Sequence, residues 1–361
     1  MRIITLSLLL CGLVIQSFGV RPPLKGYTYA SEQAPTGKEW QSPENLALNK
    51  EQPHAWFFPF QDIKSARKVL PENSIYWQSL NGNWKFNWAA DPDSRPKDFY
   101  KTDFDVTAWD NIPVPSSWNI YGVQQDGSLK YGVPIYVNQP VIFMHSVKAD
   151  DWRGGVMRTP PTNWTTYKYR NEVGSFRREF EIPEHWDGRE VFISFDGVDS
   201  FFYLWINGMY VGFSKNSRNT ANFNITNYLR SGKNIVAAEV YRNSDGSFLE
   251  AQDMFRLPGI FRTVALYSTP KVQIRDLVAT PDLDNNYTDG SLTIQADIRN
   301  FGKKTAKGYK VCYSLYANKL YSDENEPVIL ARDTKGAAIR NSVVAQVEPI
   351  TTGNTQEAEK V

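Results

Sequence analysis

The sequence predicts an all-β protein built as a β-sandwich, and three observations carry this prediction. Short apolar and aromatic runs recur from residue 79 onward, with turn residues between them at a spacing of about eight to twelve positions. Trp84, Phe86 and Trp88 alternate with polar residues, which is the period of a half-buried strand. Asn207-Gly208 is a two-residue hairpin turn. No apolar-periodic stretch is long enough to predict a structural helix.

The N-terminus has the pattern of a secretory signal peptide at residues 1–19. Arg2 precedes a largely apolar run over residues 3–18, and Ser17 and Gly19 fit the small positions before a cleavage site. The run is too short for a convincing membrane span. We therefore expect an exported protein, periplasmic or secreted, in which residues 20–44 form a polar, extended leader.

Composition narrows the class of partner. The net charge of +1 gives no reason to expect binding to nucleic acid or to an anionic membrane surface. Aromatic residues reach 14%, with 11 Trp, which is compatible with a carbohydrate-handling β protein and equally with a large aromatic core. Only Cys11 and Cys312 are present, so no disulfide framework is predicted. The histidines have no metal-ligand spacing: His54, His145 and His185.

Taken in order, the chain predicts one short helical turn and then strands. The turn spans Ile63–Val69 and stops before Pro71. Residues 112–115 predict an edge strand, because Pro113 and Pro115 cannot donate to a central ladder. Residues 149–170 are interpreted as an insertion of unknown role. Further strands are predicted at Phe176–Ile182, Glu190–Phe195, Phe201–Ile206, Tyr210–Ser214, Ala221–Ile225, Asn234–Val240 and Ile260–Leu266.

The pattern changes after Thr269-Pro270. Three further strands are predicted, at Val272–Thr280, Ser291–Asn300 and Lys307–Tyr316. They suggest a second sandwich of the immunoglobulin-like kind, which takes about 100 residues and seven strands. Residues 269–361 are too few for it, and residues 351–360 are polar without pattern, so we expect a truncated domain.

Residues 241–264 concentrate charge among large apolar side chains. Glu250, Asp253 and Arg256 lie within seven positions of one another, beside Met254 and Phe255. A partly buried carboxylate needs a cation or several donors to stay ionised. Two interpretations remain open at this point: an ion-paired structural loop, or a carboxylate aimed at a polyhydroxy ligand or a metal ion.

The same segment resembles a signature of the glycoside hydrolase family 2 β-galactosidases, in their N-terminal sugar-binding domain. Similar segments occur in the same order: SLNGNWKF at 79–86, IPVPSSW at 112–118, PIYVN at 134–138 and FDGVDSFFYLWINGMYVGFS at 195–214. The resemblance implies a jelly-roll (galactose-binding-like) β-sandwich at residues 45–268, followed by part of the immunoglobulin-like domain at residues 269–361. The family's two catalytic glutamates lie on a TIM barrel, and we find no such alternating pattern in this chain. We therefore predict no catalytic residue here and no activity of this chain alone.

The resemblance assigns two residues to a sugar pocket. Asn138 matches an Asn that reaches into the galactose site, although a loop Asn that satisfies backbone groups is the simpler alternative. Asp253 matches an Asp that ligates a monovalent cation, Na⁺ or K⁺, and contacts the sugar, whereas a salt bridge to Arg256 is its simpler alternative. Glu250 and Arg256 are expected to position Asn138 and Asp253 rather than to contact the sugar or the ion themselves.

The sequence departs from the family at a structural magnesium site. The Asp that matches Asp245 is a ligand there, but Lys215 stands at another ligand position, and a cation opposes a divalent metal. We therefore predict no divalent metal at Asp245, which is expected to pair with Lys215 or to cap its turn. A divalent cation, Mg²⁺ or Ca²⁺, is implied only for the barrel.

The function that the resemblance implies is retaining hydrolysis of terminal β-D-galactosides, with this region supporting the barrel in cis or in trans within a homo-oligomer. A stand-alone carbohydrate-binding module is the alternative from another class. The same region of a family 2 β-glucuronidase or β-mannosidase is the alternative within the family.

Overall fold

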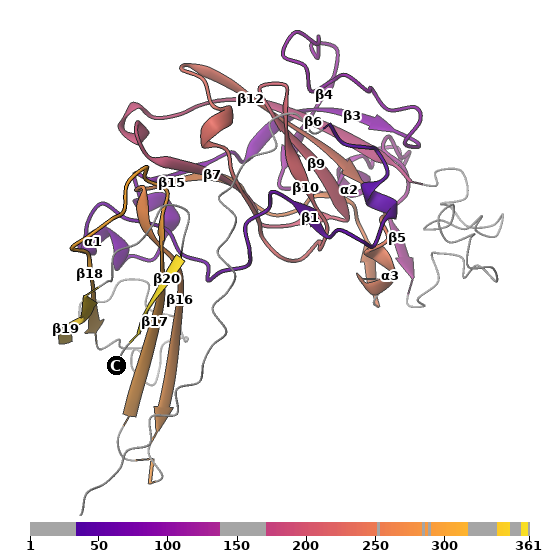
Figure 1. Cartoon of the computed structure of the whole chain (residues 1–361). Helices are drawn as coiled ribbons and strands as arrows, with labels where there is room; N and C mark the ends of the chain where they lie inside the picture. Colours follow the sequence, from indigo (N-terminus) through magenta and orange to yellow (C-terminus); the bar gives the residue numbers. More distant parts are fainter. Residues whose placement is uncertain are drawn as a thin grey trace, which may run out of the picture.

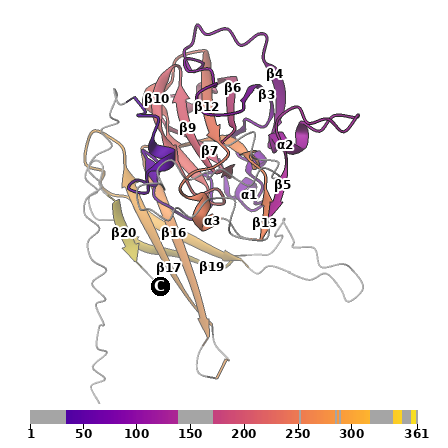
Figure 2. The same ribbon diagram turned by 90° about the vertical axis from the view of Figure 1, so that its right-hand side faces the viewer.

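The computed structural model describes residues 34–137, 171–250, 253–283, 286–287, 290–316, 338–346 and 355–359. The strands among these residues pair into antiparallel sheets and helix is scarce, so the prediction of an all-β sandwich is confirmed. Figures 1 and 2 show one twisted sandwich and, below it, a long hairpin that belongs to the second region. No helix within the described ranges is long and apolar enough to cross a membrane. Asn138 and the proposed insertion at 149–170 fall outside these ranges.

A seven-stranded antiparallel sheet forms the larger layer. The prolines at 113 and 115 keep their strand at the edge, as predicted, because they leave ladder positions without a donor. In spatial order the strands are β1 (Ala47–Leu48), β10 (Met209–Ser214), β9 (Phe201–Ile206), β12 (Lys233–Tyr241), β6 (Val173–Glu181), β3 (Gly82–Ala89) and β4 (Asp110–Val114).

A four-stranded antiparallel sheet forms the second layer. Its order is β11 (Ala221–Asn224), β7 (Glu190–Phe195), β15 (Val264–Thr269) and β2 (Trp77–Ser79). The predicted strand over 260–266 is wrong as a single element. Ile260 pairs with Val198, in a two-stranded ribbon of β8 (Val198–Asp199) and β14 (Gly259–Ile260), before the chain crosses to pair Val264 with Phe195. The chain therefore changes partners within seven residues.

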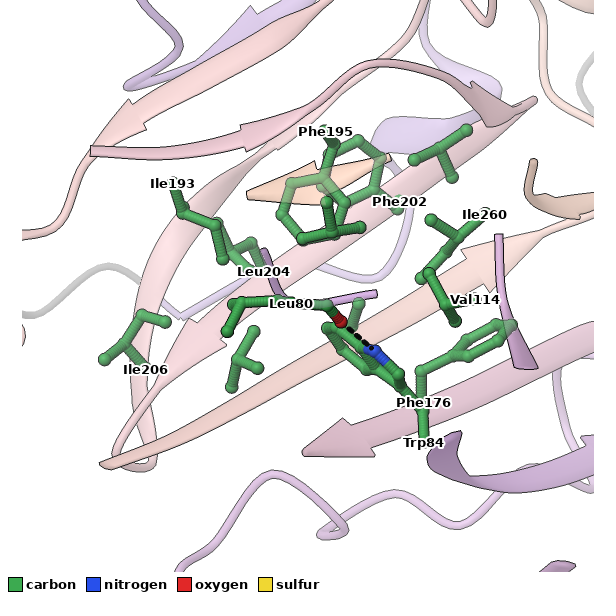
Figure 3. Close-up of a cluster of buried hydrophobic side chains, with 14 of the residues drawn as sticks. Leu80, Trp84, Val114, Phe176, Ile193, Phe195, Phe202, Leu204, Ile206 and Ile260 are labelled. Carbon is green, nitrogen blue, oxygen red and sulfur yellow. Dashed lines mark hydrogen bonds between the residues drawn. The ribbon is translucent and has the colours of Figure 1, made fainter. Parts of the chain in front are cut away.

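The core lies between the two layers. Trp84 and Phe176 from the larger sheet meet Ile193 and Phe195 from the smaller one (Figure 3). Trp84 is 1% exposed, and its indole Nε1 donates to the carbonyl of Leu80 at 2.8 Å, which satisfies the one polar atom of the ring. Burial of each such side chain stabilises the fold by about 2–3 kcal/mol.

The outer face of the larger sheet is also buried. Along β9, Phe202, Leu204 and Ile206 enter the core between the layers, whereas Phe201, Tyr203 and Trp205 enter a second cluster on the opposite face. Trp40, from the leader, stacks on Tyr241 with ring centroids 5.6 Å apart. Part of the expected leader therefore packs against the sandwich, with residues 39–41 in a short 3-10 turn.

The helical elements among the described residues are all single turns. Asp62 caps α1 (Ile63–Ala66), because its carboxylate accepts from the amide of Ser65 at 2.7 Å. The helical turn predicted before Pro71 is confirmed. The others are α2 (Trp118–Tyr121), α3 (Ser247–Glu250), η1 (Glu39–Gln41), η2 (Pro71–Asn73), η5 (Glu184–Trp186) and η6 (Thr226–Tyr228).

The second region consists of two small sheets. One has the order β16 (Val272–Leu283), β17 (Gly290–Asn300) and β20 (Thr355–Glu359), and the other pairs β18 (Lys310–Tyr316) with β19 (Ala338–Gln346). Residues 351–360, whose sequence is polar without pattern, nevertheless include a strand, because Thr355–Glu359 pairs with Arg299–Gln295. A polar edge strand of this kind has no apolar pattern to reveal it. The proposed immunoglobulin-like nature of this region stays a prediction.

Candidate sugar-binding site

A two-stranded ribbon brings the two predicted sugar-site segments together. Strand β5 (Ile135–Val137) pairs antiparallel with β13 (Met254–Arg256), and Val137 lies opposite Met254. Val137 precedes Asn138 in the chain, and Met254 follows Asp253. The register therefore joins the sequence neighbours of both predicted residues, although Asn138 itself lies outside the described ranges.

Asp253 is exposed at the start of β13. One carboxylate oxygen, Oδ1, accepts a hydrogen bond from the hydroxyl of Tyr136 at 2.5 Å. This bond raises the pKa of Tyr136, because an ionised Tyr136 would be repelled by the carboxylate it now donates to. Tyr136 thus holds one oxygen of Asp253.

An exposed aromatic pair lies beside this carboxylate. Tyr136 and Phe255 are opposite each other in the ribbon, with ring centroids 5.2 Å apart and exposed fractions of 53% and 58%. Exposed rings next to a carboxylate can pack on the C–H face of a sugar while the carboxylate accepts from its hydroxyls. The ribbon therefore offers both kinds of contact that a pyranose makes.

Glu250 and Arg256 connect the ribbon to α3. The Glu250 carboxylate accepts from the backbone amide of Ser217 at 2.7 Å and from its hydroxyl. Arg256 donates through Nη1 to the carbonyl of Glu250 at 3.1 Å. Arg256 thus joins the ribbon to α3, and Glu250 joins α3 to the turn at Ser217.

A buried ion pair lies at the base of the ribbon. Arg242 Nη1 is 2.6 Å from Glu172 Oε1, and the side chains are 2% and 0% exposed. Glu172 Oε2 also accepts from Trp118 Nε1 at 3.0 Å and from Asn119 Nδ2 at 3.1 Å. Arg242 Nη2 donates to the carbonyl of Val133 at 2.9 Å, two residues before β5. The pair therefore fixes the segment that leads into the ribbon.

Asp199 is a second charged group that the sequence did not reveal as part of this site. Its Oδ2 lies 3.5 Å from Arg218 Nη2. Burial raises the pKa of Asp199 to about 6, and Arg218 opposes that rise. Asp199, Arg218, Glu250 and Arg256 line a cavity of about 20 Å³, which has room for a single water molecule.

The expected pairing of Lys215 with Asp245 is confirmed, and it decides between the two roles left open for Asp245. Lys215 Nζ is 2.9 Å from Asp245 Oδ1, and the side chains are 2% and 9% exposed. An ammonium this close to the Asp245 carboxylate would repel a divalent ion, so these residues do not fit a magnesium site.

A monovalent cation at Asp253 is compatible with its donor chemistry. Tyr136 engages one carboxylate oxygen, and hard cations prefer oxygen ligands such as the other one. Within the described ranges, no three His, Cys, Asp or Glu side chains come together as a metal-binding group. Any further oxygen ligands for such an ion must therefore be carbonyls, hydroxyls or groups from other parts of the protein.

Comparison with known proteins agrees with the resemblance. The chain is 42% identical over 264 residues to a β-galactosidase of Priestia megaterium, and this match covers 73% of the chain and 24% of the relative. It is 36% identical over 259 residues to a β-galactosidase of Halalkalibacterium halodurans, covering 72% of the chain and 23% of the relative. It is also 32% identical over 296 residues to a β-galactosidase large subunit of Lactobacillus helveticus, covering 80% and 44%. The chain thus spans less than half the length of each of these relatives.

Solved structures share the fold. A β-glucuronidase of Bacteroides uniformis superposes with a TM-score of 0.55 at 16% identity, covering 79% of this chain and 27% of that one. At this identity the similarity shows the fold alone. Residues 77–270, more than half of the chain, match the model of the glycosyl hydrolases family 2 sugar binding domain. The chain therefore belongs to glycosyl hydrolase family 2, and its resemblance to the N-terminal region of the family's β-galactosidases is confirmed.

Proposed function

We propose that this chain is the N-terminal region of an exported β-galactosidase that hydrolyses terminal β-D-galactosides with retention of configuration. The ribbon of β5 and β13 is the observation that carries this proposal, because it gathers a carboxylate and two exposed rings beside the segment that contains Asn138. The names of the relatives that are 32–42% identical support galactose as the sugar.

The chain's own contribution would be to bind and orient the sugar. Retaining hydrolysis needs an acid/base and a nucleophilic carboxyl group about 5–5.5 Å apart. In this proposal both belong to a barrel supplied in cis or in trans, and this chain is inactive alone. Asp253, with Oδ1 held by Tyr136, would accept from a galactose hydroxyl, and Phe255 would cover the apolar side of the ring. Asn138 would donate to one hydroxyl and accept from another.

Asp253 would also supply a carboxylate oxygen to Na⁺ or K⁺, and the bound ion would offer a coordination position to a sugar hydroxyl. A homo-oligomer of the complete enzyme, and a divalent cation in its barrel, remain proposals that follow from the family.

The test is a chimera in which this chain replaces the matching quarter of the Priestia megaterium β-galactosidase. We expect hydrolysis of a chromogenic β-galactoside by the chimera and none by the chain alone. Asp253→Asn should lower kcat/KM about ten- to hundredfold, because a hydrogen bond or ion contact to a charged group is lost. Asp187→Asn is the matched control, since Asp187 is an exposed residue in a turn after η5.

Two results would contradict the proposal. In the first, Asp253→Asn and Asp187→Asn have the same activity in an active chimera. In the second, the isolated chain binds a β-galactoside through Asp253 with an affinity that joining it to the barrel does not improve. The second result would favour a free-standing carbohydrate-binding module.

A further inference from the structure

Three segments of the chain meet at the end of β10, and the side chain of Lys215 lies at their junction. This side chain is 2% exposed, and its ammonium is 2.9 Å from the carboxylate of Asp245. The same ammonium donates to the backbone carbonyl of Ser42 at 2.5 Å. Ser42 belongs to the leader and Asp245 to the turn before α3, so one buried cation joins two segments that are far apart in the chain.

The main chain makes further contacts around this cation. The backbone amide of Asp245 donates to the carbonyl of Trp40 at 2.9 Å, and the amide of Lys215 donates to the carbonyl of Leu46 at 3.0 Å. Residues 39–46, where the leader joins the sandwich, are therefore attached to Lys215 and to Asp245 through both side-chain and backbone groups.

The turn that begins at Lys215 also holds the far end of α3. The carboxylate of Glu250, the last residue of α3, accepts from the amide of Ser217 at 2.7 Å and from its hydroxyl. Asp245 lies just before α3 and contacts Lys215. Residues 215–217 therefore contact the chain on both sides of this helix.

The backbone of α3 depends on the turn that precedes it. The amides of Leu249 and Glu250 both donate to the carbonyl of Gly246, at 3.0 and 3.1 Å. A single helical turn is not stable by itself, because fixing its residues costs more than its few hydrogen bonds return. The contacts that fix Asp245 and Gly246 therefore help to fix α3, and Arg256 connects α3 to the ribbon.

A lysine ammonium suits this junction because it is compact and has three donors, which can serve a carboxylate and a carbonyl together. We propose that Lys215 is a positioning residue: it ties residues 39–46 to the turn before α3 and so sets the position of the helix that holds the ribbon. Since the cation is part of the chain, the tie needs no divalent ion. The tie does not rest on the proposed function, whereas its effect on hydrolysis does.

The test is hydrogen–deuterium exchange of the full chain, measured by mass spectrometry in peptides that cover residues 39–46 and 244–250. Lys215→Met keeps the apolar stem and removes the ammonium. We expect amide exchange about tenfold faster in both segments, because local opening no longer breaks the contacts of the cation. Exchange in β7, which lies in the sandwich core, should change less. EDTA should leave exchange in the wild-type chain unchanged.

Two further variants separate the tie from a general loss of stability. Lys233→Met breaks an ion pair of two exposed side chains and should leave exchange in both segments at the wild-type rate. Lys215→Met combined with Asp245→Asn leaves no unpaired buried charge, so global stability should partly recover. The donor to the Ser42 carbonyl is still missing in this double variant, so residues 39–46 should still exchange faster than in the wild type.

The proposal is overturned if Lys215→Met exchanges like Lys233→Met in both segments, or if the faster exchange extends equally through β7. It is also overturned if the double variant regains wild-type protection of residues 39–46, or if EDTA releases them in the wild-type chain.

The effect on hydrolysis is measured in the chimera with the Priestia megaterium β-galactosidase. Lys215→Met should lower kcat/KM about two- to tenfold, because the sugar-binding residues are less well positioned, and Lys233→Met should not. An active chimera in which both variants hydrolyse alike would overturn the positioning role. An inactive wild-type chimera would contradict the proposed function instead, and the exchange result would still decide whether Lys215 holds residues 39–46.

Discussion

Arg242→Met should destabilise the chain strongly, because it removes one half of a fully buried ion pair. The guanidinium contacts Glu172 at 2.6 Å, and both side chains are almost completely excluded from water. Met retains much of the apolar stem of Arg, so the change removes charge and hydrogen bonds more than volume. Trp118 and Asn119 still donate to Glu172 in the variant, but neither carries a charge.

The expected loss is about 3–5 kcal/mol in the free energy of unfolding, which is the usual cost of leaving a buried charge without its partner. Two further hydrogen bonds, to the carbonyls of Val133 at 2.9 Å and of Arg256 at 3.4 Å, are lost with the guanidinium. They hold the segments that lead into β5 and out of β13. We therefore expect the ribbon to become less ordered as well.

The assay is urea denaturation followed by tryptophan fluorescence, to which Trp118 contributes directly because it donates to Glu172. Glu172→Gln combined with Arg242→Met should recover part of the loss, since no buried charge remains. Lys233→Met is the matched control. It breaks an ion pair to Glu179 at 3.2 Å whose side chains are 72% and 62% exposed, so it should cost less than about 1 kcal/mol.

Two outcomes would refute this reasoning. The first is that Arg242→Met costs no more than Lys233→Met, which would mean that water reaches Glu172. The second is that the loss of stability in the double variant equals the sum of the losses in the single variants, which would mean that the two side chains act independently.

Two further predictions concern Asp199 and Gly212. The folded-state pKa of Asp199 is raised from 3.8 to about 6, so its contribution to stability is complete below about pH 4 and is lost as the pH rises through 6. Denaturation between pH 4 and 7 should show wild type losing up to about 3 kcal/mol relative to Asp199→Asn, and parallel pH profiles would contradict this. Gly212→Ala should cost about 1–3 kcal/mol, because the new Cβ would lie 2.1 Å from the carbonyl oxygen of Leu48 in β1. Gly290→Ala, whose Cβ meets nothing closer than 3.9 Å, is its control, and equal unfolding midpoints would be the contrary result.

The sequence predicted the bounds of individual strands better than it predicted which distant segments pack against them. The bounds predicted for β7 and β9 agree with the structure, because β9 is a continuous apolar run, β7 is largely apolar, and turn residues follow both. The run in β9 did not show that both of its faces are buried. The outer face of β9 is buried because the 39–41 turn and residues 99–109 cover it. Contacts between segments so far apart in the chain have no local sequence pattern.

The residues of the candidate site likewise fall into those that the sequence predicted and those that only the structure revealed. Asp253 and Asn138 were found by resemblance, and the pairing of Lys215 with Asp245 followed from their opposite charges. Glu172, Arg242 and Asp199 were not found, because a charged residue beside an apolar run is usually solvated. Glu172 and Arg242 are 70 residues apart and meet only because β6 and β12 are neighbours in the larger sheet. A simple signal was available in retrospect: charged residues directly flanking buried strands.

These buried charges explain how an exposed ribbon keeps its position. Strands β5 and β13 have three residues each and form a sheet of their own, and an isolated two-stranded ribbon is marginal in water. Arg242 ties the ribbon to the sandwich at one end through Val133 and Arg256, and Arg256 ties it to α3. The exposed side chains of Asp253 and Phe255 are then available to contact a ligand, because Arg242 and Arg256 hold the ribbon in place. Under the proposed function, stability and ligand binding in this region would depend on separate residues, and substitutions at Arg242 and Asp253 should affect different measurements.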